Sequence, residues 1–212
     1  MPDRREPLAA AWQPSLFGAA GARPGARSGR VDTGFTGAVR HRLDESAWID
    51  ECRDWVAAPD ELFEELAATL AWEAPERVMY GRLLPQPRLT VEPDVATLPA
   101  ALAEMRAALG ARYGREFDSC RVNLYRDGRD SVSWHADQIA RTVVDPFVAV
   151  VSLGAARRFL LRPRDGRTGL RLEPRSGDLL VMGGSSQRTW EHSVPKAARA
   201  GPRMSVTFRH SR

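Results

Sequence analysis

The pattern of hydrophobic and polar positions changes along the chain near residue 120. Before that point, hydrophobic residues recur at helical spacing in three stretches, which predict helices over Asp44–Val56, Pro59–Leu70 and Pro99–Tyr113. Residues 73–95 contain four prolines, too many for a continuous helix, so we expect a loop or an edge strand there.

After residue 120 the pattern is typical of short strands. Cys120, Val122 and Leu124 alternate with polar or aromatic neighbours, which is the period of a strand with two different faces. Further hydrophobic runs bounded by Gly, Pro or Asp predict strands at Phe147–Leu153, Phe159–Arg162, Leu170–Leu172, Asp178–Met182, Trp190–Val194 and Met204–Arg209. Helices followed by about seven or eight short strands indicate an α+β domain whose sheets form a sandwich or a barrel.

The 212 residues are enough for one domain with a substantial core. Residues 1–40 are rich in Gly, Ala, Arg and Ser without a period, so we expect a largely flexible arm. Residues 41–116 then form a helical and loop region, and residues 117–212 a strand-rich core.

The composition indicates an ordinary soluble protein, with 43% hydrophobic and 27% charged residues. It contains no run of 18 apolar residues, which argues against a membrane span, and no apolar segment follows Met1. Only two cysteines, Cys52 and Cys120, are present, too few for a disulfide framework. We therefore expect a cytoplasmic protein.

The net charge of +4 is unevenly distributed. Residues 1–120 contain 14 basic and 19 acidic side chains, whereas residues 121–212 contain 17 basic and 8 acidic ones. A general preference for arginine would raise the positive charge everywhere and does not explain this difference. The strand-rich half is therefore the half that a polyanion such as nucleic acid would approach.

That half also contains a candidate metal site. His135 and Asp137 lie two residues apart, and side chains at that spacing leave the same face of a strand. His192 would supply a third ligand from a distant strand. Two imidazoles and one carboxylate on one side of an ion are typical of non-haem Fe(II) oxygenases. A single buried histidine is more often a core residue, so the prediction depends on the whole set.

The set is accompanied by further motifs at plausible spacing. They are Asn123-Leu124-Tyr125, His135-Ala136-Asp137, the distal His192 and a final stretch from Arg203 to Arg209 with Thr207 inside it. Over residues 117–210 this combination resembles the AlkB family of Fe(II)/2-oxoglutarate-dependent dioxygenases, which demethylate nucleic-acid bases oxidatively. The resemblance implies a double-stranded β-helix, or jelly roll, with an N-terminal helical and loop extension that includes the substrate lid.

The resemblance also implies roles for individual residues. His135, Asp137 and His192 would bind Fe(2+), and Arg203 would pair with the distal carboxylate of 2-oxoglutarate. The rest of that pocket would be completed by Asn123, Tyr125, Ser205 and Arg209. An arginine fork holds a carboxylate with two hydrogen bonds, which a lysine cannot do. Ser205 stands where the family usually has Asn, so we expect a weakened contact there.

The implied reaction uses O2 and 2-oxoglutarate to remove N-alkyl groups from bases such as 1-methyladenine and 3-methylcytosine. It releases formaldehyde, succinate and CO2, and a base in a duplex must first be flipped out of the stack. Tyr80, Arg88 and Trp134 are the candidate substrate-binding residues. After Pro87-Arg88 the lid lacks the family's aromatic residues, and Ile139 stands where many members have an acidic one. Base preference and the choice between DNA and RNA therefore stay open.

Two other functions fit parts of the same pattern. A 2-oxoglutarate-dependent hydroxylase or demethylase could act on a protein or a small molecule, although the basic half favours nucleic acid. A jelly-roll binding module with a structural metal would not need Arg203 as a dicarboxylate clamp.

One further motif lies in the N-terminal arm. Gln13-Pro14-Ser15-Leu16-Phe17 resembles the peptide by which bacterial repair proteins dock on the sliding clamp. Two adjacent hydrophobic residues between polar ones suit insertion into a groove. The same residues could instead pack back on the protein's own core.

Overall fold

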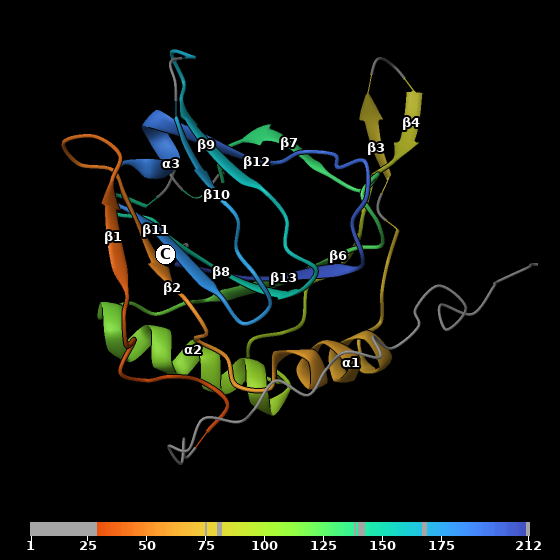
Figure 1. Cartoon of the computed structure of the whole chain (residues 1–212), viewed down its shortest axis with the longest axis horizontal. Coiled ribbons are helices and arrows are strands. Elements are labelled where there is room, and N and C mark those ends of the chain that lie inside the picture. The colour runs from red at the N-terminus through yellow and green to blue at the C-terminus, as the bar shows by residue number, and fades with distance from the viewer. Residues whose placement is uncertain are drawn as a thin grey trace, which may run out of the picture.

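The strand-rich half of the molecule consists of two facing sheets (Figure 1). The computed structural model describes residues 29–74, 76–79, 82–137, 139, 143–166 and 169–210. The strands of this half are β6 (Ser119–Tyr125), β7 (Val132–His135), β8 (Phe147–Gly154), β9 (Phe159–Pro163), β10 (Leu170–Leu172), β11 (Leu179–Gly183), β12 (Trp190–Val194) and β13 (Arg203–His210).

Consecutive strands of this half lie in different sheets, except for β9 and β10, which pair with one another in the smaller sheet. β6, β8, β11 and β13 belong to a seven-stranded sheet of order β1-β2-β11-β8-β13-β6-β5, which also includes β1 (Val39–Arg42), β2 (Trp48–Cys52) and β5 (Leu89–Val91). The remaining strands form a four-stranded sheet of order β10-β9-β12-β7. Antiparallel pairing within each of two facing sheets is the arrangement of a double-stranded β-helix, so the predicted fold is confirmed.

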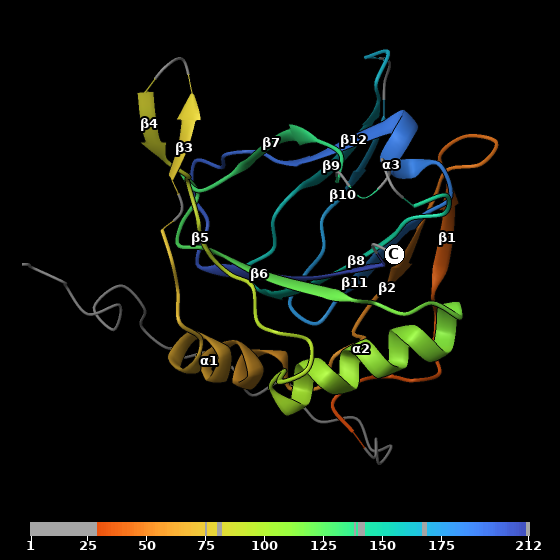
Figure 2. The same cartoon turned by 180° about the vertical axis from the view of Figure 1, so that it is seen from behind.

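Two helices cover the outer face of the larger sheet (Figures 1 and 2). α1 (Pro59–Thr69) begins with a proline and carries two acidic residues in its first turn, where the helix dipole favours negative charge. α2 (Ala100–Tyr113) ends at Gly114, whose φ of 62° is the left-handed conformation that suits glycine. The second and third predicted helices are therefore confirmed.

The helix predicted over Asp44–Val56 is wrong, because residues 48–52 form strand β2. β2 lies between β1 and β11 in the larger sheet, and Ile49 packs between the two sheets while Cys52 packs under the helices. A strand buried on both faces has hydrophobic residues at both parities, so its sequence does not alternate clearly.

The hydrophobic core is divided in two by the larger sheet. One cluster lies between that sheet and the helices and includes Leu62, Met105 and Phe208. The other lies between the two sheets and includes Ile49 and Phe159. The second cluster shares its space with the polar side chains described below.

Residues 29–40 differ from the flexible arm that the composition suggests. Val31 and Phe35 are buried in the helix-side cluster, and the Phe35 ring lies 5.6 Å from that of Trp55. The backbone N–H of Asp32 donates a hydrogen bond to the carbonyl of Trp55. A few large hydrophobic side chains are therefore enough to fix this glycine-rich segment on the core.

The proline-rich segment contains short strands, as expected for an edge. β5 is the outermost strand beside β6, and β3 (Glu76–Met79) and β4 (Arg82–Pro85) form a separate hairpin (Figure 2). None of the helices in the described part of the chain is long and apolar enough to cross a membrane.

Candidate metal and dicarboxylate site

Three side chains from the predicted metal set converge at one end of the four-stranded sheet. His135 is the last residue of β7 and pairs directly with His192 on β12, and their rings lie 4.2 Å apart. The Asp137 carboxylate lies 3.7 Å from Nε2 of His192. One ligand atom from each of the three residues can be chosen so that all lie within 4.8 Å of one another. This is close enough for one metal ion to contact all three.

A β-bulge sets the direction of the first ligand. β12 aligns His192 with His135 and Val194 with Val132, so β7 has one more residue than β12 in this interval. The extra residue allows Val132 and His135, three positions apart, to face the same cavity.

The strand argument for Asp137 is only partly correct. The side chains of His135 and Asp137 do reach the same site. However, β7 ends at His135, so Asp137 lies beyond the strand. Its direction is set by contacts other than the sheet ladder. Its backbone N–H donates to the side-chain oxygen of Gln187 at 2.9 Å, and its Oδ1 accepts a hydrogen bond from Nε of Arg209 at 2.7 Å.

The surroundings favour the protonation states that a metal requires. Burial and the neighbouring His135 lower the pKa of His192 to about 3, so its ring is neutral near pH 7. Burial opposes ionisation of Asp137, yet Arg209 and the two histidines hold its pKa below the ordinary value. Nδ1 of His135 lies 2.9 Å from the carbonyl of Ser133, and a proton there leaves Nε2 free to bind metal.

A cavity of about 50 Å³ adjoins the three ligands and reaches Arg203. Every second residue of β13 from Arg203 to Arg209 lines it, because alternate side chains of a strand share one face. The complete set of lining residues is Asn123, Tyr125, Val132, His135, Asp137, Val148, Val150, Phe159, His192, Val194, Arg203, Ser205, Thr207 and Arg209. The polar members come from β6, β7, β12 and β13, except for Asp137, which follows the end of β7, and the apolar members form the walls between them.

Arg203 is the feature of this cavity that most clearly requires a partner. It is 1% exposed, and one of its nitrogens donates to the hydroxyl of Ser152 at 2.9 Å. Its Nε and Nη1 are buried and have no hydrogen-bond partner among the described residues. Burial lowers the pKa of Arg203, although arginine remains charged in proteins. A buried cation with unpaired donors fits the far carboxylate of a dicarboxylate such as 2-oxoglutarate.

The other predicted pocket residues lie around this guanidinium. The Tyr125 ring centroid is 5.2 Å from the guanidinium carbon of Arg203. The Asn123 amide donates to the hydroxyl of Ser205 at 3.3 Å, and the weakened co-substrate contact expected at Ser205 stays a prediction. Arg209 is placed differently from the other members, because its hydrogen bond goes to the metal-ligand candidate Asp137.

Of the three predicted substrate residues, the structure describes Arg88 and Trp134. Tyr80 lies outside the described residues. Arg88 donates to the Asn123 side chain at 3.1 Å and so connects the lid segment with the dicarboxylate pocket. Trp134 does not line the cavity, and the Arg162 guanidinium lies 4.2 Å from its ring centroid. Ile139 packs against the cluster between the sheets.

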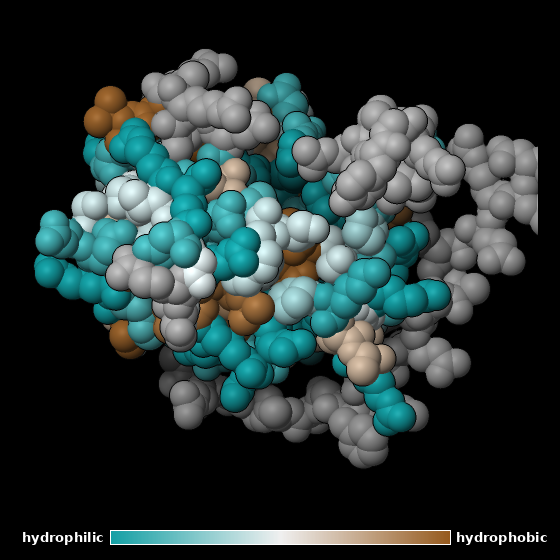
Figure 3. Space-filling view, turned by 90° about the horizontal axis from the view of Figure 1, so that it is seen from above, coloured by the Kyte–Doolittle hydropathy of each residue, from teal (hydrophilic) through white to brown (hydrophobic). Residues whose placement is uncertain are grey.

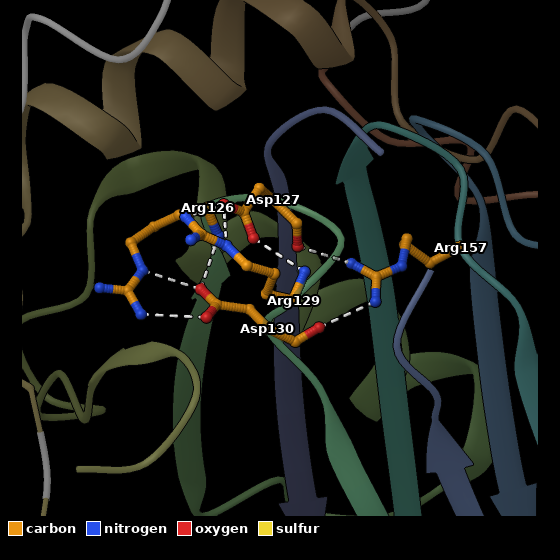
Figure 4. Close-up of polar contacts among 5 residues, drawn as sticks. All are labelled: Arg126, Asp127, Arg129, Asp130 and Arg157. Atoms are coloured by element: carbon orange, nitrogen blue, oxygen red, sulfur yellow. Dashed lines mark hydrogen bonds and ion pairs between the residues drawn. The ribbon is translucent and has the colours of Figure 1, made fainter. Parts of the chain in front are cut away.

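The connection between β6 and β7 is held in place by arginine contacts (Figure 4). Arg126 makes a two-pronged ion pair with Asp130, and Arg129 pairs with Asp127. Arg157 is 3% exposed and donates to the backbone carbonyls of Asp127 and Asp130 and, beyond β12, of Pro195. These bonds fix β7 and β12, the two strands that carry the histidines.

The sequence interpretation missed Ser152, Arg157 and Gln187. Ser152 could have been noticed, because it is a polar residue inside the hydrophobic run of β8. Arg157 and Gln187 stand in loop-like sequence without a motif, and their importance comes from contacts with residues more than 25 positions away.

Comparison with protein families gives a match over residues 51–209 to the 2OG-Fe(II) oxygenase superfamily. Among curated relatives, "Alpha-ketoglutarate-dependent dioxygenase alkB homolog 3" of Mus musculus is 30% identical over 174 residues, 71% of this chain and 60% of the relative. "DNA oxidative demethylase ALKBH2" of Arabidopsis thaliana is 32% identical over 189 residues, 69% of this chain and 60% of the relative. The chain thus spans about three fifths of these relatives.

Solved structures share the fold at low sequence identity. "The structure of OsALKBH1" aligns with a TM-score of 0.56 at 15% identity and covers 81% of this chain and 100% of that one. A prolyl hydroxylase from Trichoplax adhaerens, solved with a hypoxia inducible factor peptide, aligns with a TM-score of 0.58 at 11% identity, covering 77% and 83%. These two comparisons support the jelly roll and carry no information about substrate.

Proposed function

The chain belongs to the 2OG-Fe(II) oxygenase superfamily and, within it, to the AlkB family, and from this premise we propose that it removes N-alkyl groups oxidatively from damaged nucleic-acid bases. The observation that carries the proposal is one cavity that joins three metal-ligand candidates to a buried arginine with unpaired donors. A structural metal would explain the three ligands but not the arginine.

The residues of this cavity fit Fe(2+), 2-oxoglutarate and O2. His135, Asp137 and His192 would hold the metal on one side and leave its other positions open. When bound, iron and 2-oxoglutarate together activate O2 and supply one oxygen atom to a C–H bond, with succinate and CO2 as co-products. An N-hydroxymethyl base formed in this way breaks down to formaldehyde and the unmodified base.

The protein's own contribution is binding, orientation and exclusion of water. Arg203 would hold the distal carboxylate of the co-substrate through the donors that are now unpaired. Arg209 keeps the Asp137 carboxylate ionised and turned toward the histidines. The apolar side chains of Val148, Val150 and Phe159 line the cavity and limit the entry of water.

The charge distribution supports nucleic acid as the substrate. Residues 121–212 carry an excess of nine basic side chains over acidic ones, and the metal site lies in this half. Figure 3 shows the molecule from the side of the four-stranded sheet, where hydrophilic side chains predominate and hydrophobic ones form only small groups. Arg88 and Trp134, with Tyr80, are the proposed substrate contacts.

A substrate panel tests this function. Single- and double-stranded DNA and RNA oligonucleotides with 1-methyladenine or 3-methylcytosine are incubated with the protein, Fe(II) and 2-oxoglutarate, and formaldehyde and succinate are measured. We expect both products in similar amounts. His135→Ala should abolish both, whereas His41→Ala, which removes a side chain that contacts Glu51 away from the cavity, should retain activity.

The two products also separate the alternatives. Succinate from the wild-type protein without formaldehyde from any oligonucleotide would favour a protein or small molecule as the substrate. If folded protein supplied with iron forms neither succinate nor formaldehyde, that result would contradict an oxygenase of any kind.

We also propose, separately, that the protein acts in the cytoplasm and that its N-terminal arm docks on a bacterial sliding clamp. Gln13–Phe17 lies outside the described residues, so only its sequence supports docking on the clamp. Cys52 and Cys120 are buried and are not joined in a disulfide, which agrees with a reducing compartment. A clamp pull-down should lose retention on Leu16→Ala/Phe17→Ala, and unchanged retention would end the docking idea.

A further inference from the structure

Asp137 is attached to the rest of the site differently from the two histidines. His135 and His192 lie opposite one another in a pair of hydrogen-bonded strands, so the sheet fixes their positions. Asp137 follows the end of β7, and its backbone N–H donates instead to Oε1 of Gln187 at 2.9 Å. The two residues are 50 positions apart, and Gln187 is 2% exposed.

Gln187 is itself held in one orientation. It lies in α3 (Ser186–Thr189), the single turn between β11 and β12, and its side-chain nitrogen contacts the sulfur of Met182 at 3.5 Å. The turn before it contains Gly184 with φ of 62°, where an added Cβ would collide with the carbonyl of Ser46. Only glycine therefore allows α3 to approach the loop between β1 and β2 this closely.

Side-chain hydrogen bonds brace α3 against that loop. The hydroxyls of Ser185 and Ser46 lie 2.7 Å apart. Asp44 accepts hydrogen bonds from the indole of Trp190 at 2.7 Å and from the hydroxyl of Thr189 at 3.2 Å. Bonds at both ends of so short a helix leave the Gln187 amide little freedom to turn away from Asp137.

From this arrangement we propose that Gln187 is a positioning residue, which fixes Asp137 so that its carboxylate meets the same metal ion as the two histidines. α3 leads directly into β12, so the bond ties Asp137 to the strand of His192. The inference rests on the proposed iron site. Residues that orient ligands in this way typically alter metal affinity about 10–100-fold when they are replaced.

Two substitutions separate the hydrogen bond from packing. Gln187→Met keeps a side chain of similar length but removes the acceptor, whereas Gln187→Glu keeps an acceptor for the N–H of Asp137. Arg188→Ala is the matched control, because it changes the same helix at an exposed side chain that contacts neither Asp137 nor the loop between β1 and β2. Thermal unfolding of each metal-free variant confirms that it is folded.

The readout is binding of Co(II), which reports the site without turnover. Affinity is measured by titration, and the visible absorption of bound Co(II) reports its ligand geometry. We expect Gln187→Met to bind about 10–100-fold more weakly with an altered spectrum. Gln187→Glu and Arg188→Ala should keep the wild-type spectrum and bind Co(II) nearly as tightly as the wild type.

The outcomes distinguish the inference from the function on which it rests. Wild-type protein that fails to bind Co(II) would contradict the metal site itself. Wild-type protein that binds, with Gln187→Met equal to it in affinity and spectrum, would overturn only the role of Gln187. The same holds if Gln187→Glu is impaired as strongly as Gln187→Met.

Discussion

The two faces of strand β13 show how one segment serves stability and chemistry at once. Met204, Val206 and Phe208 point toward the helices and are fully buried among apolar side chains. The residues between them, Arg203 and Ser205 among others, line the cavity beside the metal ligands. Successive side chains of a strand point to opposite faces, so one strand can contribute to both the apolar core and the cavity.

The two faces differ in their effect on the free energy of unfolding. Removing apolar surface from water stabilises the fold by about 25 cal/mol per Å². A buried donor without a partner costs about 1–3 kcal/mol, and Arg203 has two such nitrogens. The helix-side face therefore stabilises the protein, while the cavity face keeps an unsatisfied arrangement that a co-substrate can complete.

The largest expected effect is on the helix-side face. Phe208→Ala should lower the free energy of unfolding by about 3–5 kcal/mol, because it removes a ring that is 0% exposed and leaves a cavity. Urea unfolding of the metal-free protein measures this loss. A change below about 1 kcal/mol would mean that this face is not the main source of stability.

On the cavity face, Arg203→Met should not lower the free energy of unfolding, in contrast to Phe208→Ala. The change removes two buried donors without a partner, each of which costs about 1–3 kcal/mol, so the free energy of unfolding should stay the same or rise. The same change should weaken 2-oxoglutarate binding strongly, since the clamp is lost. Urea unfolding and calorimetric titration measure the two effects, and a large loss of stability would contradict the contrast between the faces.

The smallest expected effect concerns pH. His192 has a pKa of about 3 in the fold and near 6.5 in the unfolded chain, so below pH 6.5 the unfolded chain binds a proton that the fold does not. Stability is therefore lost as pH falls from about 6.5 toward 3. Between pH 7 and pH 5 this amounts to about 2 kcal/mol.

His192→Gln should remove that contribution. Urea unfolding of both metal-free proteins at pH 7 and pH 5 is the measurement. The wild type should lose about 2 kcal/mol more than the variant over this interval. Equal losses would mean that the imidazole is not neutral and buried as the structure places it.

The strands of the strand-rich half could be predicted from the sequence because their hydrophobic residues follow the local pattern of a strand. β13 alternates strictly, so the sequence gives both its secondary structure and the set of residues that line the cavity. β2 was assigned as a helix because Ile49 and Cys52 are buried on opposite faces of the sheet. Such burial depends on neighbours more than 100 residues away, which local periodicity cannot include.

The sequence by itself determined which chemical groups this protein has and in what order: two imidazoles, a carboxylate and a strand whose alternation aims its two arginines into the cavity. The tertiary structure decided how they meet. The bulge in β7, the unpaired donors of Arg203 and the bond from Asp137 to Gln187 all arise where distant segments come into contact. The physical reason is that side-chain period is a local property, whereas burial and hydrogen-bond pairing depend on the whole fold.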